Sequence, residues 1–135
     1  EMADAVATQI IIDGDRNVVQ KFTNVSDGTG ESAVVKVDVS ALAANSHGSA
    51  CTGVVIEEIW WQCIGMKVQI LWNATTNVFC IELGENQSGN HNYSTFGGLT
   101  NNAGSGVNGD VLFTTVGHTS ADTYTIILKM KKEYG

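Results

Sequence analysis

The chain of 135 residues contains no proline, and charged residues make up only 16% of it. Without proline, its turns must rely on the 15 glycines and on Asn and Asp. No apolar run approaches the roughly 18 residues that a membrane-spanning helix needs. The start lacks the basic and apolar segments of a secretory signal, and we expect Met2 to be the natural first residue, with Glu1 left over from expression. We expect a single domain over residues 1–135, with residues 1–8 as an extended N-terminal segment.

Positive charge is also scarce. Seven Lys and Arg stand against 14 Asp and Glu, so the formal net charge is −7. Phosphate backbones and anionic lipids are bound by clustered cations, and the one cluster here is Lys129, Lys131 and Lys132. We therefore expect neither nucleic acid nor a membrane as a partner.

Alternation of apolar and polar residues with a period of two dominates the chain. It is clear at residues 35–39, where three valines share one face, and at residues 66–72 and 124–131. Turn signals rich in Gly, Asn and Asp separate such segments. The pattern predicts an all-β protein: a single antiparallel β-sandwich of eight or nine short strands, with jelly-roll or other Greek-key topology. The expected strands are residues 6–12, 17–23, 35–39, 54–63, 66–72, 79–83, 92–96, 111–116 and 124–131. Ser40 is expected to cap one helical turn over residues 40–44.

Cysteine spacing gives no framework. Cys51, Cys63 and Cys80 are odd in number and form no C-x-x-C pair, which favours reduced thiols, although the spacing leaves one bridge open. Nor do the three histidines group with a cysteine as in a zinc site.

Two motifs imitate ligand sites. Residues 104–109 match G-x-G-x-x-G, but a strand rather than a helix is expected to follow, so we interpret them as a flexible loop. Asp13, Asp15 and Asn17 resemble the start of a calcium loop, but Asn24 stands where the bidentate Glu belongs, and a hairpin turn explains the same residues. No G-x-S-x-G or other catalytic motif is present. We expect no catalytic residue, cofactor or metal, and no enzymatic activity.

Apolar residues that should face both sides of a strand are the most informative feature. Trp60 and Trp61 are adjacent, so one must point outward, and residues 10–12 and 126–128 raise the same problem. Burial against a second copy solves it, since exposed apolar patches mark interfaces. A bulge at Glu57 and Glu58, or a covering loop, is the alternative. The expected oligomer interface consists of Trp60, Trp61, Ile126, Ile127 and Leu128.

Segments along almost the whole chain resemble a family of small virion structural proteins of tailed phages that infect aquatic bacteria. The resemblance is carried by residues 13–17, 21–32, 96–110, 113–118, 122–128 and 132–135. It implies a capsid decoration or cement protein, a homotrimeric β-sandwich on the outer shell of the virion, assembled in the host cytoplasm.

The partners implied are the protein itself and the major capsid protein. We expect the N-terminal segment to contact the capsid, through Ala3, Asp4, Ala5 and Val6. The alternative is a carbohydrate- or receptor-binding module of a phage head or tail fibre, with Trp61 or Trp72 as a platform on which a sugar stacks.

Overall fold

Side chains alternate between the two faces of a strand, and burial follows that alternation. The computed structural model describes residues 5–134. In β2 (Asn17–Asp27) every second residue from Val18 to Ser26 is buried, and β5 (Lys67–Trp72) repeats the pattern. One face of each strand therefore belongs to a core and the other to the surface.

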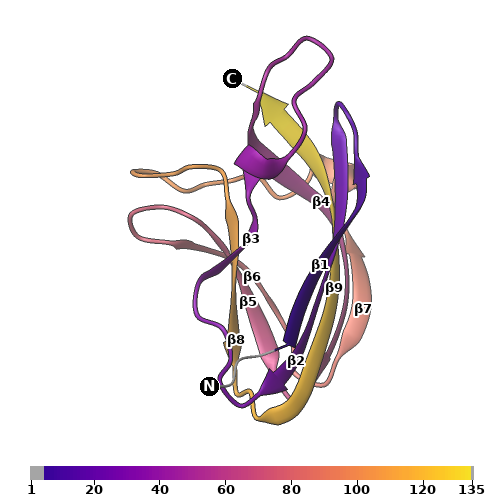
Figure 1. Cartoon of the computed structure of the whole chain (residues 1–135), viewed down its shortest axis with the longest axis vertical. Coiled ribbons are helices and arrows are strands. Elements are labelled where there is room, and N and C mark those ends of the chain that lie inside the picture. The colour runs from indigo at the N-terminus through magenta and orange to yellow at the C-terminus, as the bar shows by residue number, and fades with distance from the viewer. Residues whose placement is uncertain (1–4, 135) are drawn as a thin grey trace.

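Two antiparallel sheets pack face to face (Figure 1). The five-stranded sheet has the order β1-β2-β9-β4-β7, and the four-stranded sheet has the order β3-β8-β5-β6. The other strands are β1 (Ala5–Asp13), β3 (Val34–Val37), β4 (Cys51–Ile64), β6 (Val78–Leu83), β7 (Ser88–Asn92), β8 (Val111–Val116) and β9 (Ser120–Tyr134). Two short 3-10 helices, η1 (Val39–Ala41) and η2 (Ser94–Phe96), lie between strands. Within residues 5–134 no helix has the length and apolar character needed to cross a membrane.

The strand order is that of a jelly roll. β2 pairs with β9, β3 with β8, β4 with β7 and β5 with β6, as in a long hairpin rolled up into two sheets. β1 adds a further strand beside β2. The predicted antiparallel sandwich is confirmed. Strands β4 and β9, of 14 and 15 residues, are longer than the short strands expected.

Aromatic side chains join the two sheets. Phe22 of β2 and Tyr124 of β9 both contact Phe113 of β8 edge to face, with ring centroids 5.2 and 5.9 Å apart. Trp72 of β5 is only 1% exposed. Burial of each such side chain contributes about 2–3 kcal/mol to stability, so these four aromatics are among the strongest contributors to the core between the sheets.

The region after β6 differs from the prediction. The strand expected at residues 92–96 is wrong: β7 lies earlier, and residues 94–96 form η2, which ends at Gly97 with a φ of 91°. β7 has no apolar residue and is exposed throughout, so only its pairing with β4 identifies it as a strand. The helical turn expected near Ser40 is η1, and its cap is Asp38, whose side chain accepts a hydrogen bond from the Ser40 N–H.

Candidate binding surfaces

The residues predicted to form the oligomer interface lie on both faces of the five-stranded sheet. Trp60 pairs with Ile127 on the outer face, and Trp61 pairs with Ile126 on the inner face. Ile126 and Leu128 are fully buried in the core, so the prediction is wrong for these two residues. A bulge does lie between Ile56 and Glu58, but it precedes the tryptophans and leaves Trp60 outside, 38% exposed.

Trp61 begins a row of aromatic side chains beside the edge strand β7. Its indole lies over Gly89 and contacts His91, with ring centroids 4.7 Å apart. Tyr93 and Phe96 continue the row at 6.0 and 6.1 Å, and Phe96 is 68% exposed. The sequence did not indicate this row, since it extends from β4 through β7 to η2.

Two polar atoms of the aromatic row are enclosed. Within the described chain, the indole N–H of Trp61 and the hydroxyl of Tyr93 are buried without a hydrogen-bond partner. Burial raises the pKa of the Tyr93 hydroxyl. Trp72 lies in the core, so the structure contradicts its predicted role as a sugar platform.

Strand β1 is an exposed apolar edge. The side chains of Val6, Ile10, Ile11 and Ile12 are each about half exposed. Only β2 pairs with this strand, and a bulge separates Ile10 from Ile12. Of the predicted capsid contacts, Ala3 and Asp4 lie outside the described residues, Ala5 begins β1 and Val6 is exposed.

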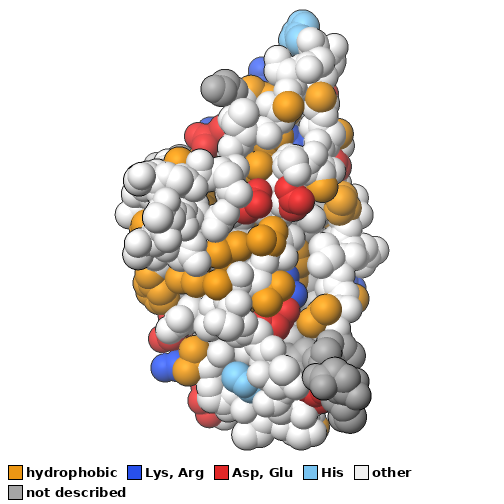
Figure 2. All heavy atoms as spheres, turned by 60° about the vertical axis from the view of Figure 1, so that its left-hand side comes forward, with side chains coloured by type: hydrophobic (Ala, Val, Ile, Leu, Met, Phe, Trp, Pro, Cys, Tyr) orange, Lys and Arg blue, Asp and Glu red, His pale blue; other side chains and the backbone are white. Residues whose placement is uncertain are grey.

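A second apolar surface crosses the outer face of the four-stranded sheet. Val35, Leu112, Leu71 and Phe79 are neighbours in register on β3, β8, β5 and β6. Figure 2 shows apolar side chains gathered across the middle of this side of the molecule. Val35 and Phe79, on the two edge strands, are exposed, and Leu112 between them is buried.

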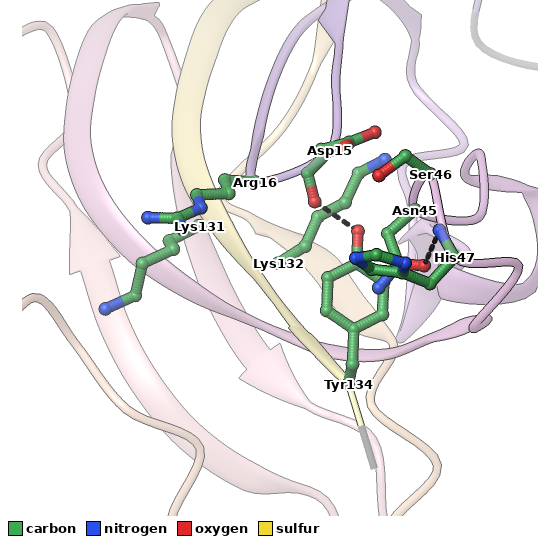
Figure 3. A pocket seen from close by; sticks show the side chains of 8 residues that line it. All are labelled: Asp15, Arg16, Asn45, Ser46, His47, Lys131, Lys132 and Tyr134. Atoms are coloured by element: carbon green, nitrogen blue, oxygen red, sulfur yellow. Dashed lines mark hydrogen bonds between the residues drawn. The ribbon is translucent and has the colours of Figure 1, made fainter.

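A shallow hollow of about 470 Å³ lies at the end of the sandwich that carries the β1–β2 hairpin (Figure 3). Arg16 and Lys131 extend side by side on one side of it, and Ser46 and His47 lie on the other. The Tyr134 hydroxyl donates a hydrogen bond to the Asp15 carbonyl beneath. Arg16 and Lys131 point away from Ser46 and His47 (Figure 3), so these two cations do not converge on a ligand in the hollow.

The carboxylate of Asp13, the first residue of the calcium-loop-like motif, is engaged in an ion pair. It pairs with the buried ammonium of Lys132 and also accepts a hydrogen bond from the Ala43 N–H at 3.0 Å. Burial alone would raise the pKa of Asp13, but these hydrogen bonds and the positive charge of Lys132 outweigh it and lower the pKa. The sequence places Lys132 in a basic cluster with Lys129 and Lys131. In the structure its positive charge is neutralised by Asp13 at the end of the sandwich that carries the β1–β2 hairpin. Among residues 5–134 no three His, Cys, Asp or Glu side chains lie close enough to hold a metal ion.

The three cysteines are free thiols. Cys51 and Cys63 are buried, and Cys80 is half-buried. Burial raises the pKa of Cys63 to about 11 and that of Cys80 to about 12. Because the thiolate is the reactive form, these two side chains behave as packing groups near neutral pH.

The glycine-rich segment packs against neighbouring backbone. Gly106 lies against Thr75, and Gly109 lies against the Thr52 carbonyl, both with positive φ. The segment leads directly into β8, not into a helix. A helix N-terminus that could bind pyrophosphate is thus missing from this part of the described chain.

No protein-family model matches the chain, and no curated protein shows significant sequence similarity to it.

Proposed function

We propose that this protein is a non-enzymatic structural protein that assembles into a homo-oligomer, and that it decorates the outer shell of a tailed-phage virion. The observation that carries self-association is the apolar edge strand β1, with Val6, Ile10, Ile11 and Ile12 each about half exposed. From Val6 to Ile12 the strand contains no charged residue and no proline, the usual devices that keep an edge from pairing.

The apolar row on the four-stranded sheet adds to this argument. Val35 and Phe79 lie at its two ends, each about half exposed. Exposed apolar side chains gathered on one side of a molecule, as in Figure 2, are typical of an interface between proteins. Two such surfaces on one small domain suit a protein with more than one neighbour.

The virion assignment rests on the resemblance along the chain, and the jelly roll agrees with it. Viral capsid domains often have this fold, as do lectins, so the fold alone does not decide between them. As a homotrimer bound to the major capsid protein, the protein would combine several weak contacts into strong binding.

Sedimentation velocity of the full chain tests the proposal. We expect a species of three times the mass of one chain, and we expect Ile10→Lys with Ile12→Lys to shift it to monomer. The control is Thr76→Lys, an exposed position in the turn before β6. It should leave the oligomer intact. A wild-type chain that stays monomeric at high concentration contradicts the proposal, whereas circular dichroism shows whether the double variant is folded.

The aromatic row supports carbohydrate binding as a second candidate. Phe96 and His91 are exposed beside Trp61, and sugars stack on such rings. A glycan array with the wild type, Phe96→Ala and the control Phe79→Ala tests it. We expect a bound glycan to be lost only with Phe96→Ala, and an array without signal contradicts this candidate.

A further inference from the structure

The positive charge of this acidic protein is divided unequally between its surfaces. Three of the seven cations form ion pairs with carboxylates, those of Lys36, Lys67 and Lys132. The other four make no ion pair within the described chain: Arg16, Lys21, Lys129 and Lys131. We call these four residues the basic stripe.

The basic stripe lies on the outer face of the five-stranded sheet. Lys21 is opposite Ile127, and the side chains of Lys129 and Lys131 follow Ile127 on the same face of β9. Arg16 extends beside Lys131 (Figure 3). Two carboxylates are paired in register with these strands on this face: Glu58, opposite Lys129, whose side chain accepts a hydrogen bond from Asn90, and Glu133, which follows Lys131 and lies opposite Gly53.

An apolar centre adjoins the basic stripe. Trp60 and Ile127 are cross-strand neighbours, and Lys21 flanks Ile127 on the next strand. Tryptophan is among the residues enriched at the energetic centres of protein interfaces. The stripe and Trp60 together therefore have the composition of a docking surface.

The surface that fits this face must be acidic, and the chain itself offers one. Asp27 ends β2 opposite Ser120, Asp122 lies against Gly65, and Glu85 lies near Gly117, so all three carboxylates are at one end of the sandwich. This is the end with the β4–β5, β6–β7 and β8–β9 turns, at the bottom of Figure 1. We call it the acidic end.

We propose that the basic stripe of one copy docks on the acidic end of the next copy. A two-fold contact of stripe against stripe would oppose four cations to four, with Glu58 and Glu133 the carboxylates in register on each side, so an excess of positive charge would face its like, which is repulsive. Charge thus favours a heterologous contact, and such contacts close into rings when the rotation permits. This inference rests on the proposed homo-oligomer and specifies its geometry as face to end.

A single charge reversal tests the basic stripe. At about 0.02 M NaCl, where surface charges are little screened, we expect Lys21→Glu to weaken association on the order of ten-fold. Thr76→Glu with Asn102→Glu makes the same change in net charge at exposed loop positions away from both the basic stripe and the acidic end, and is the matched control. At about 1 M salt the difference between the two variants should vanish.

Mixing distinguishes a heterologous contact from a two-fold one. The first variant is Lys21→Glu with Lys131→Glu, and the second is Glu85→Lys with Asp122→Asn, which keeps an acceptor for the Thr119 N–H. Each variant should be monomeric alone. In the first, an acidic stripe faces the acidic end of the next copy, and in the second, the basic stripe faces an end that has lost its negative charge. Mixed in equal amounts they should associate again in part, since two of the three contacts in a trimeric ring then join the stripe of one variant to the acidic end of the other or the reverse, which restores attraction.

The outcomes separate this inference from the proposed function. If the wild type forms an oligomer that depends on Ile10 and Ile12, but Lys21→Glu and the control with two added glutamates behave alike, or the mixture stays monomeric, the face-to-end contact is wrong and the homo-oligomer stands. If the wild type is monomeric, both fail. If the wild type binds a DNA duplex in a gel-shift experiment at low salt and Lys21→Glu does not, the stripe binds nucleic acid and the inference is overturned.

Discussion

Replacing Glu31 by alanine is expected to lower the free energy of unfolding by about 4 kcal/mol, because it leaves a buried ammonium without its counter-ion. The Lys36 Nζ lies 2.5 Å from one carboxylate oxygen of Glu31, and both side chains are almost fully buried. The other oxygen accepts hydrogen bonds from the Tyr124 hydroxyl at 2.6 Å and from the Asn24 amide at 3.0 Å.

Glu31 also connects the two sheets. Its backbone N–H donates to the Thr115 hydroxyl of β8, while its side chain contacts β2 and β9 of the other sheet. One substitution therefore removes a charge partner and a link between layers. Glu31→Gln keeps a carbonyl oxygen for Tyr124 and should cost less than alanine.

Urea unfolding monitored by circular dichroism measures this effect. The control is Glu82→Ala. Glu82 pairs with Lys67 at 3.7 Å, and both side chains are more than one-third exposed. An exposed pair of this kind contributes at most about 1 kcal/mol. Equal losses of unfolding free energy in Glu31→Ala and Glu82→Ala would show that burial does not make the Glu31–Lys36 ion pair stronger than the exposed pair.

Gly109→Ala is expected to destabilise the protein by about 3 kcal/mol, through left-handed backbone strain and a clash. Gly109 has a φ of +88°, and a Cβ placed there would lie 2.2 Å from the Thr52 carbonyl oxygen of β4. Because the obstacle is backbone, no rotation of a side chain relieves it. The next residue, Asp110, accepts a hydrogen bond from the Val39 N–H, so displacement of Gly109 also disturbs the start of η1.

Thermal unfolding of Gly109→Ala beside Gly104→Ala gives a matched comparison within one loop. Gly104 has no neighbouring atom within 4 Å of an added Cβ and no positive φ. We expect Gly104→Ala to leave the melting temperature nearly unchanged. If both variants melt at the wild-type temperature, the contact of the loop with Thr52 carries no stability.

Much of the fold could be predicted because local alternation has a local cause. Residues 66–72 are predicted as a strand and β5 covers residues 67–72, since Val68, Ile70 and Trp72 are buried and alternate with side chains on the other face. The sandwich follows from many such segments in a chain with hardly any helical period. The jelly-roll order was one of the expected topologies, and strand pairing identifies it.

Segments without an apolar face could not be assigned this way. β7 has the sequence Ser-Gly-Asn-His-Asn and is a strand because the backbone of β4 offers it hydrogen-bonding partners. Residues 92–96 contain two aromatics and read as a strand, yet two of their rings join the aromatic row instead. Local composition does not contain this information, because strand pairing depends on residues some 30 positions away.

The sequence by itself determined the class of the fold and the excess of negative charge, because both depend on residue type and near-neighbour spacing. It also required one of Trp60 and Trp61 to face outward. Only the tertiary structure decided which one, since register with β9 places Trp60 outside and buries Ile126 and Leu128. The same holds for the Glu31 contact with Tyr124, 93 residues away, and for the basic stripe. Contacts between distant strands follow from how the sheets are paired, and pairing is a property of the whole chain.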